Sequence, residues 1–416
     1  MTADATAPLK SSARYFIVLV FLISAFNQAD RLLIGIVSQA IKLEFTLSDT
    51  LLGLLGGTSF ALMYSVIGLP IARLTDRSNR RNVLAFCIGL WSLMTAACGL
   101  SASFVQLILA RVGVAAGEAG FVPPTHSLMT DFVSERRRAA GFSIIAVGAA
   151  VGAFLANSVG GYFTTHFGWR SAFLALGIPG ALLALVVAMT LREPPRTTSG
   201  TSLPNAFAPS LKRLLGNRIY LQCIIASGIH LILVYGMAFW SAPFFIRGFG
   251  LTAAKAGAIL GVLGSVFGIL GAVAGGMLGD RLALRDRRWL ALWPALSIAI
   301  ATPFCLAGFL TPVLGVAIGC LAVAAACNAM YQASTYTLVQ AQVTAQERAT
   351  AAALMILVQS LIGLAIGPLL IGALSDYVTA AHIAGGLGVV LACVSLLNIP
   401  SALLFVSCAR SMRAPS

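Results

Sequence analysis

The sequence predicts an all-α membrane protein with twelve transmembrane helices in two pseudo-symmetric six-helix bundles. Of its 416 residues, 59% are hydrophobic and only 10% are charged, whereas soluble domains carry roughly a quarter charged residues. Apolar segments long enough to cross a bilayer, which takes about 20 residues, recur from one end of the chain to the other. A short loop motif also recurs at corresponding places in the two halves.

The apolar segments fall into two sets of six, separated by one polar linker. We expect the first bundle to occupy residues 1–191, a cytoplasmic linker residues 192–216, and the second bundle residues 217–416. The linker is rich in Pro and Ser, which favours a poorly packed connector. The predicted spans lie near residues 15–41, 51–73, 83–102, 104–129, 140–163, 171–191, 217–246, 253–279, 289–310, 312–339, 350–374 and 383–408.

The positions of the 27 Lys and Arg residues indicate the orientation. Most of them gather in alternate loops, near residues 73–81, 136–138, 192–218 and 281–288, and few lie in the loops between. Because basic residues favour cytoplasmic loops, we expect a multi-pass protein of the cell membrane with both termini in the cytoplasm. The formal net charge of +14 is therefore a topology signal, and we expect no nucleic-acid partner.

Other classes of protein lack a basis in this sequence. The first apolar segment is too long for a cleavable signal peptide and carries Asp30 and Arg31 in its interior. The eight Cys residues lie in apolar segments without a CxxC pair, as packing residues do. Neither the hydrolase motifs HExxH and GxSxG nor a phosphate-binding GxxxxGK[ST] loop is present. We therefore expect no enzyme activity, no cofactor and no metal site.

The loops after the second and eighth spans share an Asp-Arg pair followed by further arginines. Any cytoplasmic loop is basic, so the arginines alone carry little information. The repeated aspartate does carry information, because the positive-inside rule says little about acidic residues. We expect these residues to latch one half to the other in one conformation: Asp76, Arg77, Arg80, Arg81, Asp280 and Arg281.

Four charged residues lie deep in two predicted spans of the first half. They are Asp30 and Arg31 in span 1, and Arg111 and Glu118 in span 4. A charge at the bilayer centre costs roughly 2.5–3.5 kcal/mol on insertion scales, so we expect these groups to pair with one another. Burial favours the neutral form of a carboxylic acid, whereas a nearby arginine favours the carboxylate. Such a group can carry a proton, although the pairs could also be static links between the two spans.

Glu118 is the first candidate for the proton-carrying group, with Arg31 controlling when it releases the proton. Asp30 is the competing candidate. Because Arg31 is its neighbour in the sequence, a permanent Asp30–Arg31 pair is the interpretation that we favour for it.

The predicted spans of the second half contain polar and aromatic side chains but no buried carboxylate. We expect spans 1, 4, 7 and 10 to line a central cavity. A single buried histidine is more often a hydrogen-bonded packing residue than a proton relay, and that alternative stays open for His230. The residues expected to line the cavity are Arg31, Arg111, Glu118, His230, Asn328, Tyr331, Gln332 and Gln359.

The chain resembles the major facilitator superfamily, and within it the Spinster group. The loop Ala72–Arg81 resembles the superfamily signature after the second helix, although Ala72 and Asn79 stand at two positions that are usually Gly. The Spinster resemblance rests on Asp30-Arg31, on Gly117-Glu118-Ala119-Gly120 and on Gly168-Trp169-Arg170. It implies movement of lysolipids or sphingosine-phosphate-like amphipaths. It also implies that Glu118 takes part in proton coupling, and that Arg31 is its partner or a ligand of the substrate phosphate.

The main hypothesis is therefore proton-coupled transport of an amphipathic anion by alternating access. The second hypothesis is a proton symporter of a small organic anion, since Gly-Glu-Ala-Gly and Gly-Trp-Arg also occur in organic-anion symporters of the superfamily. A third, from another class, is a receptor or scaffold that moves nothing. The expected partners are the anionic substrate, protons and the lipid bilayer, and we expect a monomer.

Overall fold

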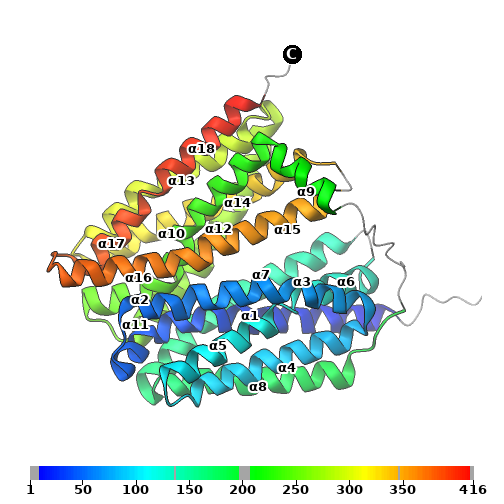
Figure 1. The fold of residues 1–416 in the computed structure, drawn as a ribbon, viewed down its shortest axis with the longest axis horizontal. Helices are drawn as coiled ribbons and strands as arrows, with labels where there is room; N and C mark the ends of the chain where they lie inside the picture. The colour runs from blue at the N-terminus through cyan, green and yellow to red at the C-terminus, as the bar shows by residue number, and fades with distance from the viewer. Residues whose placement is uncertain (1–8, 135–136, 196–206, 345–346, 413–416) are drawn as a thin grey trace, which may run out of the picture. The chain divides into compact units, whose positions relative to one another are not determined.

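A computed structural model describes residues 9–134, 137–195, 207–344 and 347–412, and every regular element in these ranges is a helix (Figure 1). Within these ranges, twelve helical segments are long and apolar enough to cross a membrane, which confirms the predicted fold class. They are Ala13–Phe45, Asp49–Arg77, Arg80–Gly99, Phe104–Phe132, Ala140–Phe167, Trp169–Thr190, Arg218–Phe249, Ala253–Arg285, Trp289–Leu310, Leu314–Ala341, Thr350–Ala380 and Gly386–Ser411.

The helices form two compact units. The first unit also takes in Thr252–Ala258, at the start of the eighth span. Within this unit α1 packs along α7, and α4 packs along α8 and α5. Its helices are α1 (Leu9–Phe45), α3 (Ser59–Arg77), α4 (Arg80–Gly99), α5 (Phe104–Glu118), α6 (Val122–Phe132), α7 (Arg138–Phe167) and α8 (Trp169–Thr190).

The second unit takes in Thr46–Thr58, the start of the second span. Within it α13 packs along α14 and α18, and α12 packs along α14. In the described residues, three spans contain a π-helical turn, at Leu54–Thr58, Leu263–Phe267 and Gln359–Leu364. The helices are α2 (Asp49–Gly53), α9 (Phe207–Gly216), α10 (Arg218–Phe249), α11 (Ala253–Val262, shared with the first unit), α12 (Gly268–Arg285), α13 (Trp289–Leu310), α14 (Leu314–Ala341), α15 (Arg348–Val358), α16 (Ala365–Ala380), α17 (Gly386–Ser395) and α18 (Asn398–Ser411).

Glycine allows the closest helix contacts in both units. A Cβ atom at Gly152 of α7 would lie 2.1 Å from the carbonyl oxygen of Ala25 in α1. A Cβ atom at Gly271 of α12 would lie at the same distance from the carbonyl oxygen of Ala326 in α14. Both contacts are with backbone that cannot move aside, so only glycine fits. Small residues serve this purpose widely in membrane helices.

The fourth span is broken at its middle, between α5 and α6. Pro123 and Pro124 lie in the first turn of α6 and have no N–H to donate to the carbonyl groups of Ala119 and Gly120. At the break the backbone forms hydrogen bonds between residues three apart instead of four, since the N–H of Phe121 donates to the carbonyl of Glu118 at 3.0 Å. The break places Glu118 at the last position of α5.

The predicted linker is partly helical. Residues 207–216 form α9, in which Leu214 is buried. The Nη1 atom of Arg213 in α9 lies 3.0 Å from a carboxylate oxygen of Glu347, just before α15. Hydrogen bonds from Thr344 hold the pKa of Glu347 below its ordinary value. Residues 196–206 of the predicted linker lie outside the described residues.

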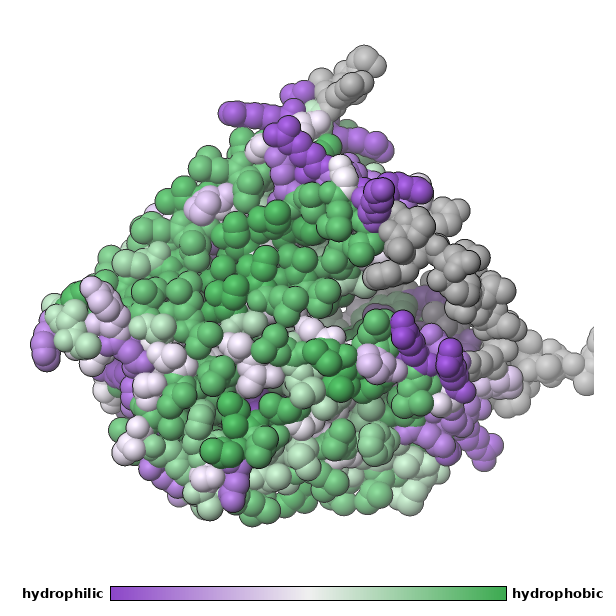
Figure 2. All heavy atoms as spheres, viewed as in Figure 1, coloured by the Kyte–Doolittle hydropathy of each residue, from purple (hydrophilic) through white to green (hydrophobic). Residues whose placement is uncertain are grey.

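Hydrophobic side chains cover most of the visible surface in Figure 2, and hydrophilic ones gather toward its edges. Many large apolar side chains are exposed along the spans, for example Phe86, Leu109 and Leu403. A soluble protein rarely exposes contiguous apolar patches of this extent. The surface therefore fits a multi-pass membrane protein.

Candidate functional site

The charged residues of spans 1 and 4 meet inside the first unit. Nε of Arg31 in α1 donates a hydrogen bond of 2.5 Å to Oε2 of Glu118 in α5. The Glu118 side chain is fully buried, whereas 29% of the Arg31 side chain is exposed. The pair therefore has one buried acid and one cation that other molecules can reach.

The sequence around Glu118 lets its helix come close to α4. A Cβ atom at Gly117 would lie 2.6 Å from the backbone nitrogen of Trp91. Glycine at this position is thus required for α5 to pack where it does. The same packing buries Glu118 next to the break in the fourth span.

Two aromatic rings of α3 lie against the Arg31 guanidinium. The Cζ atom of Arg31 is 4.8 Å from the ring centroid of Tyr64 and 5.3 Å from that of Phe60. Arg111 approaches the same Phe60 ring, at 5.4 Å. Aromatic faces attract cations, by about 0.5–2 kcal/mol for each contact. They therefore hold both arginines in this site.

Asp30 lies in the same site and faces a different arginine. Its side chain is 3% exposed and lies beside Thr95 of α4, and its charge interacts with those of Arg111 and Glu118. Nη1 of Arg111 also donates to the backbone carbonyl of Asp30, at a long 3.4 Å. Oδ1 of Asp30 and Oε1 of Glu118 have no hydrogen-bond partner in the described part of the chain.

The structure does not form the Asp30–Arg31 pair that their adjacency suggested. Successive side chains on a helix do not face each other. Arg31 is turned toward Glu118 in α5, and Asp30 toward Thr95 in α4. The two carboxylates therefore have different partners.

The polar residues of the second unit form a separate, buried group. Nδ1 of His230 in α10 is 2.9 Å from Oδ1 of Asn398, and its Nε2 is 3.4 Å from the carbonyl oxygen of Asn328. The His230 ring also meets Tyr331 edge-on, with the centroids 4.5 Å apart. His230 is fully buried, and both of its nitrogens have partners. This arrangement favours the packing alternative for His230.

The two glutamines proposed for the cavity differ in their exposure. Gln359 is 7% exposed, and its amide donates to Ser227 at 3.4 Å. Gln332 is exposed and lies one turn before Tyr336, to which it is hydrogen-bonded.

Among the predicted latch residues, Arg80 is the buried one. It is 4% exposed at the start of α4. Its guanidinium pairs with Asp131 of α6 at 2.5 Å and with Glu193 after α8 at 2.7 Å, and donates to Ser127 at 3.0 Å. Arg80 therefore ties three segments of the first unit together.

The other predicted latch residues lie nearer the surface. Arg81 is half-buried, and its backbone N–H donates to Glu193 at 2.9 Å. Asp76 and Arg77 are exposed at the end of α3, and Asp280 and Arg281 are exposed in α12.

A second buried carboxylate cluster, in the second unit, was missed by the sequence analysis. Asp49, at the start of α2, is 1% exposed and accepts two hydrogen bonds from the Arg247 guanidinium, at 2.6 and 2.8 Å. Ser375 donates to the same carboxylate at 2.6 Å. The Asp376 carboxylate accepts hydrogen bonds from the backbone N–H groups of Asp49 and Thr50, both at 2.8 Å. The cluster fixes α2 to α10 and α16.

We expect Asp49→Asn to lower the thermal stability of the protein in detergent. Losing one partner of a buried ion pair costs about 3–5 kcal/mol, because the other charge remains without compensation. Glu44→Gln is a matched control, because the Glu44–Arg170 pair is 41% and 37% exposed. Exposed pairs contribute only about 0–1 kcal/mol. An equal Tm for the two variants would show that the Asp49 cluster does not stabilise the second unit.

Comparisons with known proteins agree with this architecture. A family model described as Major Facilitator Superfamily matches residues 20–368. An MFS-type efflux pump of Mycolicibacterium smegmatis is 29% identical over 359 residues, covering 86% of this chain and 83% of the pump. A probable galactarate/D-glucarate transporter of Bacillus subtilis is 27% identical over 309 residues, covering 67% of each chain. These relatives indicate a transporter and not an enzyme.

Solved structures give the same result. A bacterial homolog of the human lysosomal transporter Spinster, in an inward-facing and unoccupied conformation, matches with a TM-score of 0.88. It is 29% identical to this chain, and the match covers 97% of this chain and 98% of the homolog. A D-xylose-proton symporter matches with a TM-score of 0.76 at 17% identity, covering 95% and 97% of the two chains, which shows a shared fold. The expected resemblance to the Spinster group is confirmed.

Proposed function

Since the chain belongs to the Major Facilitator Superfamily, we propose that it is a proton-coupled secondary transporter of an amphipathic anion, working by alternating access. The observation that carries this proposal is the pair between the buried carboxylate of Glu118 and Arg31, whose side chain is partly exposed. A fully buried acid next to a reachable cation is the arrangement that links a proton to an anion.

Glu118 is the proposed proton carrier. While Arg31 is paired with it, the carboxylate is the favoured form. When Arg31 turns to an anionic substrate, Glu118 is left buried without its hydrogen-bonded partner and binds a proton. Substrate and proton are coupled if the two conformations of the transporter differ in their affinity for both.

The substrate proposal has two versions. Likeness to the Spinster homolog supports an amphipathic anion such as a lysolipid or a sphingosine-phosphate-like lipid. The galactarate/D-glucarate relative supports a small organic anion instead. Tyr64 and Phe60 beside Arg31 favour the first version, because they add apolar surface next to the cation.

A thermal-shift screen followed by flux in proteoliposomes separates the two versions. The probes are lysophosphatidylglycerol and galactarate. Stabilisation and flux with lysophosphatidylglycerol alone support the amphipathic anion. The same response to galactarate alone supports the organic-anion symporter, and no flux of either probe contradicts both versions.

The polar group of the second unit is proposed to face the same substrate. Arg111 belongs to this proposal on the side of the first unit. His230 then acts by fixing Asn328 and Asn398 and not as a proton relay, because its ring is fully buried between the side-chain oxygen of Asn398 and the carbonyl oxygen of Asn328. The second-unit residues concerned are His230, Asn328, Tyr331, Gln332 and Gln359.

The proposed topology follows the positive-inside rule. Both termini and the segment 192–216 are cytoplasmic in this proposal, the protein lies in the cell membrane, and it works as a monomer. The division into bundles at residues 1–191 and 217–416 is part of the same proposal.

The Asp-Arg motifs are proposed to control the balance between the inward-open and outward-open states. We expect Asp76→Asn to change this balance more than it changes substrate affinity. Asp76 is exposed at the end of α3, whereas Glu118 is buried at the end of α5. Distances between spin labels on the two halves measure the balance. Asp280→Asn is the matched variant in the repeated loop. Unchanged distances in Asp76→Asn would remove the latch role.

A further inference from the structure

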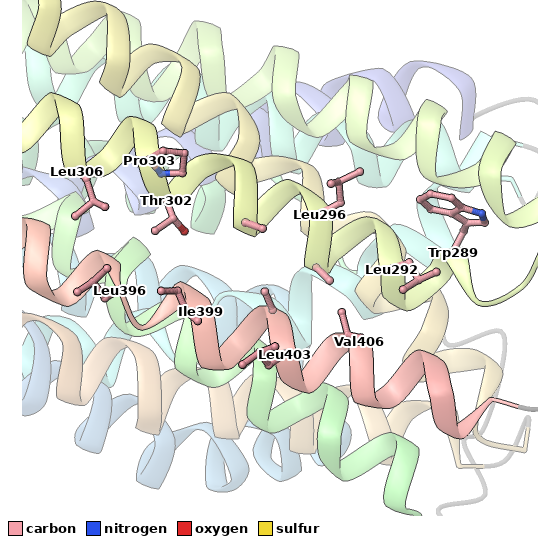
Figure 3. Close-up of a pocket in the computed structure, with 13 residues that line it drawn as sticks. Trp289, Leu292, Leu296, Thr302, Pro303, Leu306, Leu396, Ile399, Leu403 and Val406 are labelled. Atoms are coloured by element: carbon pink, nitrogen blue, oxygen red, sulfur yellow. The ribbon is translucent and has the colours of Figure 1, made fainter.

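A long apolar groove runs between α13 and α18 in the second unit (Figure 3). Its cavity volume is about 670 Å³, within the range of roughly 300–1,000 Å³ for small-molecule sites. Leu292, Leu296 and Leu306 of α13 face Ile399 and Leu403 of α18 across it.

Small residues widen the groove along the seam where α13 and α18 pack against each other. Ala295 and Ala299 of α13 and Ala402 of α18 leave space along the groove. Pro303 also lines it and has no N–H to bond the carbonyl of Ala299, so the α13 backbone is weakened there. Thr302, whose hydroxyl is bonded to the carbonyl of Ile298, contributes no free donor. The groove is therefore suited to a hydrocarbon chain.

The two ends of the groove differ in charge. α13 begins at Trp289, directly after Arg287 and Arg288, and α18 has Arg410 in its last turn, beyond Val406. In Figure 3, Trp289 and Val406 lie at one end, and Leu306 and Leu396 at the other. No charged residue follows α13 before α14 begins, at that second end. The basic end fits an anionic headgroup.

Two features of the basic end favour a specific ligand. Nε of Arg288 is buried and has no hydrogen-bond partner among the described residues. The Asp286 carboxylate accepts a hydrogen bond of 2.9 Å from the backbone N–H of Arg288. This bond does not involve the Arg288 guanidinium. Trp289 adds an amphipathic ring of the kind that settles at the headgroup level.

We propose that the groove between α13 and α18 binds an anionic phospholipid, with an acyl chain along the groove and the headgroup beside Arg288 and Arg410. From Trp289 to Leu306 the groove spans about 26 Å of helix, close to the hydrocarbon thickness of about 30 Å. One leaflet is about half of that, so an acyl chain entering at the basic end fits within the groove.

The test compares the purified full chain with two sets of variants. The probes are phosphatidylglycerol and phosphatidylcholine with the same acyl chains, added to the protein in detergent, and bound lipid is counted by native mass spectrometry. Ala299→Phe fills the groove at an exposed position. Ala272→Phe, at an exposed position of α12 outside the groove, is its matched control. Arg288→Gln with Arg410→Gln removes the basic end, and Arg348→Gln is the control for charge.

We expect the wild type to retain phosphatidylglycerol in preference to phosphatidylcholine. Ala299→Phe should lose this lipid, and the double arginine variant should bind it roughly 25-fold more weakly, at about fivefold for each arginine. Equal binding of both lipids by the wild type would mean that the groove is covered by bilayer lipid without selectivity, and would overturn the proposal. Equal binding of phosphatidylglycerol by Ala299→Phe and Ala272→Phe would also overturn the proposal. If Ala299→Phe does not fold, the arginine variants alone test it.

Discussion

Glu118→Gln is expected to abolish proton-driven accumulation of substrate while substrate exchange remains measurable. Glutamine has the shape of the protonated acid but cannot release a proton. Glutamine fills the same fully buried space as Glu118. The substitution leaves Arg31 without its ionic partner, at a cost of about 3–5 kcal/mol, so the folded fraction of the variant is checked before transport is measured. The Arg31 side chain, which is 29% exposed, remains able to meet an anion. The measurement is uptake into proteoliposomes with and without a pH gradient, together with counterflow at equal pH.

Thr95→Ala is a suitable control, because Thr95 lies in the same site beside Asp30 and its hydroxyl neither releases nor binds a proton at physiological pH. It should keep gradient-driven accumulation. Accumulation in Glu118→Gln at the wild-type level would contradict the proposed role of Glu118. Loss of both accumulation and exchange would instead point to a structural role for the pair.

Arg31→Ala is expected to impair accumulation and exchange together. The substitution leaves a buried carboxylate without its partner, at a cost of about 3–5 kcal/mol. Glu118 escapes this cost by binding a proton, which it then does not release during the cycle. The substrate anion also loses its proposed ligand. Counterflow and gradient-driven uptake in proteoliposomes measure the two losses separately.

Two comparisons make the result specific. Arg170→Ala removes an arginine that also pairs with a carboxylate, Glu44, and lies over an aromatic ring, Trp169, at 4.3 Å. That pair is exposed, so transport should persist in Arg170→Ala. Arg31→Lys keeps the charge but has no planar guanidinium for the contacts with Tyr64 and Phe60, so we expect partial activity. Exchange at the wild-type rate in Arg31→Ala would show that Arg31 does not hold the substrate.

Features with a strong local signal could be predicted from the sequence. A bilayer needs a long apolar stretch for each crossing, so all twelve spans were identified, with ends that differ from those of the structure by up to six residues. Charges inside apolar spans are costly, which singled out Arg31 and Glu118 before their contact was known. The break in the fourth span was also visible in Pro123-Pro124, but it was not recognised.

Features that depend on long-range contacts could not be predicted in this way. Asp49 and Arg247 lie at span ends and 198 residues apart, so each looked like an ordinary loop charge. Arg80 was placed in a basic loop, and only the fold brings Asp131 and Glu193 to it and buries it. The directions of Asp30 and Arg31 depend on which neighbouring helix each side chain meets, and adjacency in sequence pointed to the wrong pair.

The pH dependence of substrate counterflow, measured side by side in Asp30→Asn and Glu118→Gln, tests the central claim most directly. Both carboxylates are buried in the same site, but the proposal gives the proton to Glu118 alone. We expect Asp30→Asn to keep the pH profile of the wild type and Glu118→Gln to make counterflow independent of pH. If counterflow became independent of pH in Asp30→Asn and kept the wild-type pH profile in Glu118→Gln, the account would be contradicted and the proton would be assigned to Asp30.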